Sequence, residues 1–263
     1  MRLSAPVFVA LTVVSASCTN LLDAPSGSAG FVTMEAREAG TGSFVVTPLA
    51  VFYGQTNLRF NSGQPGACAI QPYTDDDPPF NSGNTLDVGS HIITNLPARQ
   101  DTLLPVNEFG FRLYRSPNAG GIPLVPGDTF SLTVPGGTRF PAAAMSARTA
   151  EAFTFDSVGV PAVNQPLPIT WSAAPVSGST IVFSLRYGND RSAGVVNEQL
   201  ACWFNDTGSG EIDPGWLDGW IRAMGGLREV SATRLRSREV QIDANTRLAI
   251  ISTFSVPTPS LFQ

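Results

Sequence analysis

Residues 126–137 read Pro-Gly-Asp-Thr-Phe-Ser-Leu-Thr-Val-Pro-Gly-Gly, and this order of residue types indicates the fold. The run from Thr129 to Val134 is typical of a strand, and a Gly/Pro signal for a tight turn lies on each side of it. The same pattern recurs along the first half of the chain. It predicts further strands at 31–37, 43–53, 86–96 and 109–114.

Composition favours the same fold. Only 14% of the 263 residues are charged, whereas the chain contains 25 Gly and 21 Pro. Few charges and many turn formers favour short strands joined by tight turns over long helices. Hydrophobic residues make up 43% of the chain, which is enough to build a packed core. The length allows one large β domain or two small ones.

A composition break at 159–168, where three Pro fall close together, suggests a boundary between two parts. We expect an N-terminal β domain at 31–158 and a C-terminal sandwich-like domain at 159–263, with 142–155 ambiguous between helix and strand. In the second part, Leu167-Pro168-Ile169-Thr170-Trp171 resembles a strand of immunoglobulin-like sandwiches. The expected fold class is therefore mostly β, with one or two antiparallel sandwiches of immunoglobulin-like or jelly-roll type. Strands are expected in this part at 179–187, 198–204, 228–242 and 247–256.

One short helix is predicted at 214–224. Asp213 is a suitable N-cap, Pro214 suits the first helical position, and Gly225-Gly226 can end the helix. Apolar residues repeat between these ends at helical spacing, which predicts a stripe that packs against the sheet. The stripe consists of Trp216, Leu217, Trp220, Ile221 and Met224.

The N-terminus has the order of a secretory signal: a basic Arg2, an apolar run, and the small residues 15–17 before Cys18. This segment resembles the lipobox of bacterial lipoproteins, although Ser15 stands where that family usually has Leu. The resemblance implies a signal peptide at 1–17, a lipid on Cys18 that anchors the protein to a membrane, and a tether at 18–30. Plain secretion after cleavage before Cys18 and an uncleaved anchor are the alternatives.

Export would place the cysteines in an oxidising compartment. If Cys18 carries a lipid, Cys68 and Cys202 form an even pair that suggests a disulfide. Two separate buried thiols are the other interpretation. Two Cys and one His also leave no finger-type zinc site.

Three of the four tryptophans, Trp203, Trp216 and Trp220, lie close together in the sequence. If their rings were exposed and coplanar, they would form a platform for stacking sugar rings. Trp216 and Trp220 belong to the apolar stripe, however, which argues that they are buried. Arg234, Arg236 and Arg238 alternate and therefore share one face of a strand. A solvated strand face is the expected role of these arginines, and an anion-binding ridge is the alternative.

Acidic residues suggest only a weak metal site. Asp75, Asp76 and Asp77 could offer oxygens to calcium, although a solvated loop explains them as well. The stretch 205–213 resembles a calcium loop, but Trp216 stands at the twelfth position, where an EF-hand needs Glu. A Gly-rich turn that leads into the predicted helix accounts for this stretch better. No metal and no cofactor is expected.

Common catalytic motifs are missing. His91 is the single His, and the sequence has no nucleophile elbow, phosphate-binding loop or dinucleotide fingerprint. The net charge of −5 also argues against a nucleic-acid partner. We therefore expect not an enzyme but an exported lipoprotein of the cell envelope, with a binding or structural role and a glycan or another envelope protein as its partner. A carbohydrate-binding module and a hydrolase that works through carboxylates are the alternatives.

Overall fold

The computed structural model describes residues 27–54, 63–73, 85–97, 99–108, 110–156, 158–188, 196–223 and 227–257. Thirteen strands form one large sheet, and two more form a small one. Along the large sheet the order is β3 (Cys68–Pro72), β12 (Glu198–Asn205), β11 (Thr180–Tyr187), β14 (Arg228–Asp243), β15 (Thr246–Pro257), β1 (Ser28–Gly40), β2 (Ser43–Gly54), β6 (Phe111–Arg115), β5 (Arg99–Glu108), β4 (Ile92–Leu96), β8 (Thr129–Val134) and β9 (Ala143–Arg148). The short β7 (Ile122–Leu124) pairs with β2 off this path.

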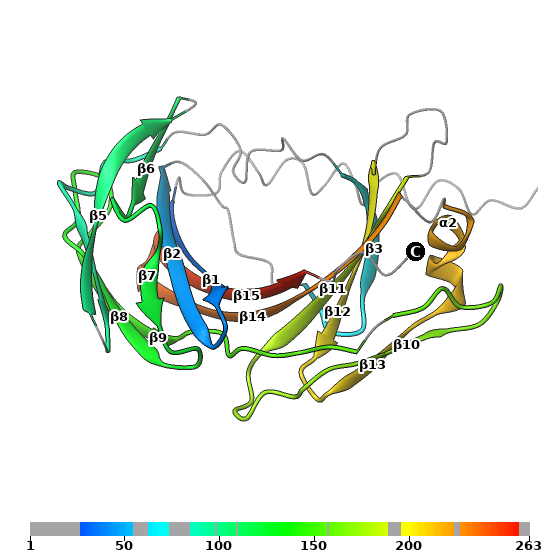
Figure 1. Ribbon diagram of the computed structural model, residues 1–263. Coiled ribbons are helices and arrows are strands. Elements are labelled where there is room, and N and C mark those ends of the chain that lie inside the picture. The colour runs from blue at the N-terminus through cyan, green and yellow to red at the C-terminus, as the bar shows by residue number, and fades with distance from the viewer. Residues whose placement is uncertain are drawn as a thin grey trace, which may run out of the picture.

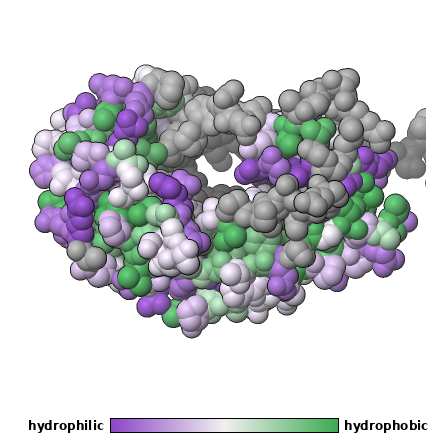
Figure 2. Space-filling view, viewed as in Figure 1, coloured by the Kyte–Doolittle hydropathy of each residue, from purple (hydrophilic) through white to green (hydrophobic). Residues whose placement is uncertain are grey.

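The large sheet is strongly curved and has two ends (Figure 1). Strands β5, β6, β8 and β9 lie at one end, strands β3, β11 and β12 lie at the other, and the long β14 and β15 run between them. Figure 2 shows the molecule hollowed between these two ends. The small sheet, β10 (Leu167–Thr170) with β13 (Ser209–Ile212), adds a second layer at the β12 end.

A parallel pair joins the N-terminal and C-terminal strands. β1 runs parallel to β15, whereas its other neighbour, β2, is antiparallel. Side chains point alternately to the two faces of β1, so Val32, Met34 and Ala36 share one face. All three are fully buried, which identifies this face as the one that packs on the core. β1 begins at Ser28, so the last three residues of the expected tether belong to the sheet.

One hydrophobic core runs through both ends of the molecule. Phe52 of β2 packs edge to face against Phe140 with a ring separation of 4.8 Å, whereas Phe183 of β11 packs against Phe155 at 5.7 Å. Phe52, Phe140 and Phe183 belong to a single cluster of buried side chains, and the partly buried Phe155 packs against it. Strands on both sides of the expected boundary at 159–168 therefore share one sheet and one core. A smaller apolar cluster, centred on Val51, Tyr53, Phe111 and Leu113, lies on the opposite face of β2.

The opening stretch folds as its residue types indicate. β8 occupies Thr129–Val134, with Gly127 before it and Gly136 after it, both at positive φ. A Cβ on Gly136 would lie 2.5 Å from the backbone nitrogen of Ala142, so this turn needs both the freedom and the small size of glycine.

The mostly-β, sandwich-like fold with one short helical segment is confirmed. Four strands fall outside the predicted ones: β3, β5, β7 and β13. Of the expected strand at 86–96 only β4 forms, because the segment before it instead donates the Val88 N–H to the Tyr114 hydroxyl. The ambiguous 142–155 contains the strand β9.

The predicted helix is divided in two. A 3₁₀ turn, η1 (Pro214–Trp216), precedes the short helix α2 (Asp218–Arg222). Asp213 is the N-cap residue and Pro214 follows it at the start of the turn, as predicted, but the cap is made by the Asp213 carbonyl, which accepts the Trp216 N–H, and not by its side chain. Leu217 and Trp220 are buried as the stripe requires, but Trp216 is exposed. None of the described helices is both long and apolar enough to cross a bilayer.

Candidate functional site

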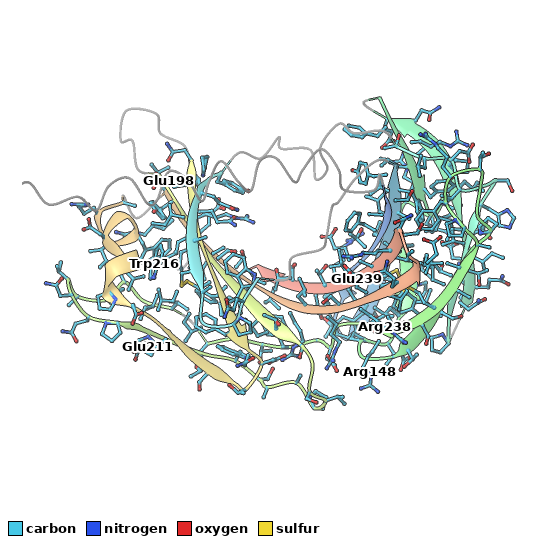
Figure 3. The ribbon with its side chains drawn as sticks, turned by 180° about the vertical axis from the view of Figure 1, so that it is seen from behind. Arg148, Glu198, Glu211, Trp216, Arg238 and Glu239 are labelled. Carbon is cyan, nitrogen blue, oxygen red and sulfur yellow. A yellow bond between two sulfur atoms is a disulfide. The ribbon has the colours of Figure 1, made fainter. Side chains whose placement is uncertain are left out.

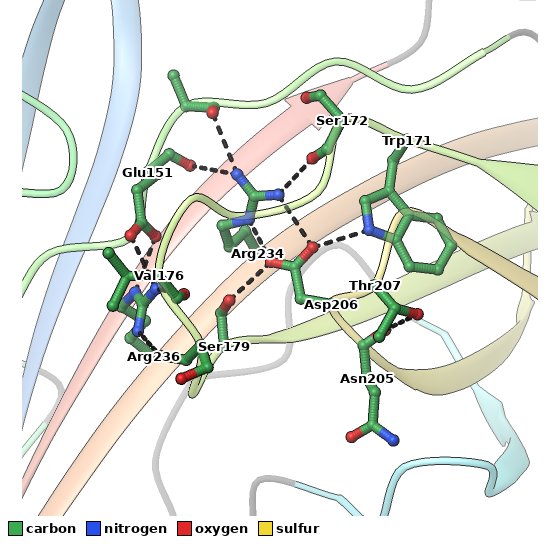
Figure 4. A network of polar contacts seen from close by, with 12 residues as sticks. Glu151, Trp171, Ser172, Val176, Ser179, Asn205, Asp206, Thr207, Arg234 and Arg236 are labelled. Atoms are coloured by element: carbon green, nitrogen blue, oxygen red, sulfur yellow. Dashed lines mark hydrogen bonds and ion pairs between the residues drawn. The ribbon is translucent and has the colours of Figure 1, made fainter.

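A network of buried charges occupies the middle of the core face of β14, between the two ends of the molecule (Figure 4). Arg234 at its centre is only 1% exposed. Its Nε and Nη2 donate to the two carboxylate oxygens of Asp206 over 2.6 and 3.0 Å. The remaining N–H groups donate to three backbone carbonyls, those of Glu151 (3.4 Å), Ala152 (3.1 Å) and Ser172 (2.6 Å). All five N–H donors of this guanidinium therefore have acceptors.

Asp206 completes the network from the turn after β12. Its carboxylate also accepts hydrogen bonds from the Trp171 indole over 2.8 Å and from the Ser179 hydroxyl over 2.7 Å. Burial raises the pKa of Asp206, but the hydrogen bonds from Arg234, Ser179 and Trp171 outweigh burial and hold that pKa below its ordinary value. Asp206 therefore stays ionised and is a poor general acid.

A second pair lies beside the first. Arg236 donates from Nε and Nη2 to the two oxygens of the buried Glu151 over 2.8 and 2.7 Å, and its Nη1 donates to the Ser177 carbonyl. The expectation that Arg234, Arg236 and Arg238 form a solvated strand face is thus wrong for the first two. These three do share a face, but it is the core face of β14, and only Arg238 is exposed.

The buried network supports part of the wall of a groove of about 720 Å³. Both Ala152 and Ser172 line this groove, and Arg234 holds the backbone carbonyl of each. The guanidinium of Arg234 also lies 4.8 Å from the ring centre of Phe153, a third lining residue. The position of these walls therefore depends on one buried side chain.

Aromatic rings form much of the walls of the groove, and charges form its rim. Phe254 of β15 packs edge to face against Phe44 at 5.6 Å and against Phe153 at 6.2 Å. Arg37 and Glu38, at the end of β1, are exposed and line the same groove. Apolar walls with a few polar groups are typical of ligand sites, and the volume is in the usual range. Sequence reasoning missed this groove because its residues come from separate segments.

The three tryptophans do not assemble the sugar platform that the sequence left open as an alternative to burial. Trp220 is fully buried and packs against Tyr187, whereas Trp216 is 37% exposed. Trp203 is partly buried in β12, and a Cβ at Gly63 would lie 2.2 Å from its indole nitrogen, so the backbone of Gly63 covers this ring. A platform needs exposed coplanar rings, and Trp220 cannot contribute to one.

The remaining sequence candidates lie apart from the groove. The structure joins Cys68 to Cys202 by a disulfide, which links β3 to β12. His91 is partly buried, and its Nδ1 lies 2.8 Å from the hydroxyl of the neighbouring Ser90. The stretch 205–213 forms the Asp206 turn and the strand β13. Asp75, Asp76, Asp77 and Cys18 lie outside the described residues.

The described residues that line the groove include a single carboxylate. Glycoside hydrolysis uses a pair of carboxyl groups that face each other across the substrate. Glu38 is the one carboxylate among the described residues that line the groove, and the buried Glu151 and Asp206 are held by arginines. Within the described ranges, no three His, Cys, Asp or Glu side chains gather as a metal site would require.

Comparison with known protein families and with curated proteins finds no match for this chain.

Proposed function

We propose that the protein is an exported lipoprotein of the cell envelope whose body binds a ligand in the aromatic groove, defined by Phe44, Phe153 and Phe254 with the rim residues Arg37 and Glu38. The groove supports this proposal because it combines ring-lined walls with exposed charges at its edge. The buried network behind it fixes the walls before a ligand arrives, which lowers the entropic cost of binding.

The ligand class that fits is a glycan. Sugar rings present C–H groups that pack on aromatic faces, and their hydroxyls accept and donate hydrogen bonds. Arg37 offers donors at the rim, whereas Glu38 offers acceptors. A purely structural role, or contact with another envelope protein, is the alternative function.

A glycan array with the purified mature protein tests the groove. We expect binding that falls at least about 10-fold in Phe44→Ala, which removes one wall, and in Glu38→Gln, which removes a rim charge; tenfold corresponds to about 1.4 kcal/mol. Trp216→Ala is the matched control, because Trp216 is exposed but does not line the groove. A flat array would contradict glycan binding and favour the structural or protein-contact role.

Mass spectrometry of the mature N-terminus tests the anchor separately. The proposal expects a diacylglycerol-modified Cys18 at the first position. An unmodified Cys18 would contradict the lipid anchor and leave plain secretion as the route of export.

A further inference from the structure

A second hollow, of about 300 Å³, lies between β9 and β14 and shares no lining residue with the aromatic groove. Two exposed arginines, Arg148 of β9 and Arg238 of β14, line it. Figure 3 places these two side chains close together at the same side of the molecule. We refer to this hollow as the arginine cleft; its other lining residues are Thr129, Ser146, Ala147, Gly178, Arg236 and Ser237.

The charge of the arginine cleft is positive. Arg236 is neutralised by its two-bond pair with Glu151, so it adds no net charge. Arg148 lies 3.9 Å from the same Glu151 carboxylate, and this carboxylate has already engaged Arg236. Arg148 and Arg238 therefore leave about two positive charges facing the cleft. The protein as a whole has a net charge of −5, so the arginine cleft is a positive region on a negatively charged molecule.

No other described carboxylate that could compensate these charges reaches the cleft. Glu239 is next to Arg238 in the sequence, but successive residues of a strand point to opposite faces. Glu239 lies on the far face of β14 (Figure 3), where it pairs with Arg247 at 3.8 Å. The two cleft arginines thus face solvent without a dedicated anion.

Hydrogen-bond donors in the cleft are also in excess. Arg238 donates one Nη1 hydrogen bond to the Ser146 carbonyl, which orients its guanidinium toward β9 and leaves its other N–H groups for a ligand. Thr129, Ser146 and Ser237 add hydroxyl groups to the lining. Guanidinium forks and hydroxyls together are the donors that bind oxyanions well.

We propose that the arginine cleft is a binding site for a doubly charged phosphate group. A phosphate monoester carries about −1.5 to −2 at pH 7 and so balances two guanidinium groups, whereas a single carboxylate would leave one uncompensated. Free inorganic phosphate and the monoester headgroup of an anionic lipid present the same chemistry. This site is independent of the aromatic groove, so a failure of glycan binding leaves it standing.

Calorimetric titration of the mature protein with sodium phosphate, at fixed ionic strength set by sodium chloride, tests the site. We expect saturable binding that weakens at least about 10-fold in Arg148→Gln and in Arg238→Gln. When the wild-type titration is repeated at a higher fixed ionic strength, the affinity should also fall. Arg148→Lys should retain part of the affinity, because it keeps the charge but loses the fork. Arg99→Gln, an exposed arginine that does not line the cleft, is the matched control.

If Arg238→Gln fails to fold, Arg148→Gln decides the test. The Arg148 side chain donates no hydrogen bond to another described side chain or carbonyl, whereas the Arg238 side chain donates one to the Ser146 carbonyl. Unchanged phosphate affinity in a folded Arg148→Gln variant would overturn the proposal, as would phosphate heats no larger than those of chloride. Co-sedimentation with phosphatidic acid vesicles, against phosphatidylcholine vesicles, then separates the two sources. A headgroup source predicts vesicle binding that free phosphate competes away, whereas phosphate binding without vesicle binding identifies the free anion.

Discussion

Arg234 is the centre of the buried network in the middle of β14. It joins three segments that are distant in sequence: the Asp206 turn, the 151–152 backbone and the Ser172 backbone. A buried charge is costly to desolvate, and only a complete set of partners compensates for it. Arg234 has such a set, which explains how a charged side chain is tolerated within a core face.

Truncating Arg234 is therefore expected to be severe. Arg234→Met leaves the Asp206 carboxylate, 2% exposed, without its countercharge, and we expect a loss of about 3–5 kcal/mol in the free energy of unfolding. Urea denaturation measures this loss. Arg222→Ala, which removes an exposed ion pair with Asp218, should cost no more than about 0.5 kcal/mol. Equal losses in the two variants would show that the buried network contributes little.

Asp206 gives stability a specific pH dependence. Its pKa is lower in the folded protein than the ordinary value of about 3.9, so the folded state binds this proton less tightly than the unfolded state does. The resulting stabilisation is present above pH of about 4 and is lost as pH falls through the lowered pKa.

Asp206→Asn removes that titration. We expect the free energy of unfolding of the variant to be lower than that of the wild type at pH 7. This difference should become smaller below pH of about 4, as urea unfolding across the pH range can measure. Asp218→Asn, at an exposed carboxylate, should follow the wild-type curve. A gap that stays constant down to pH 2 would contradict the assignment to Asp206.

Among the elements, β3 shows how a weak strand is secured. It has five residues, lies at the edge of the sheet and pairs only with β12 among the described strands. Its register places Cys68 opposite Cys202, and the disulfide joins the same pair. The bond therefore holds an edge strand that has little burial of its own, since Ile70 is exposed.

Reduction should loosen this edge and destabilise the protein. The two cysteines are 134 positions apart, and loop entropy sets an upper limit of about 5 kcal/mol on the contribution of the bond. Urea denaturation with and without dithiothreitol measures it, and Cys68→Ser/Cys202→Ser should not respond to the reductant. If thiol titration shows full reduction while the wild-type midpoint stays unchanged, this contribution is absent.

At the scale of the whole molecule, one sheet and one core connect the N-terminal and C-terminal parts. β1 from the first part lies between β2 and β15. Its parallel neighbour, β15, is the last described strand of the chain and belongs to the second part. The buried network adds contacts between the 149–156 segment and β14. If either the N-terminal or the C-terminal part were removed, the other would lose strand pairing and buried hydrogen bonds.

We therefore expect a single cooperative unfolding transition. Differential scanning calorimetry of the mature protein should give equal calorimetric and van't Hoff enthalpies, as a two-state protein does. Residues 159–263 expressed alone should lack the sharp thermal transition of the whole protein, because β15 would lose β1. Two separate transitions would instead support two independent domains.

The sequence by itself determined the mostly-β class, the turns around β8, and the alternation that places three arginines on one strand face. These properties depend on neighbouring residues, because turn geometry and the two-residue period of a strand are local. Only the tertiary structure decided that this face points inward, since the partners of Arg234 lie 28, 62 and 83 positions away in the chain. The aromatic groove and the arginine cleft likewise exist only once distant strands meet, and for that reason no local pattern predicted them.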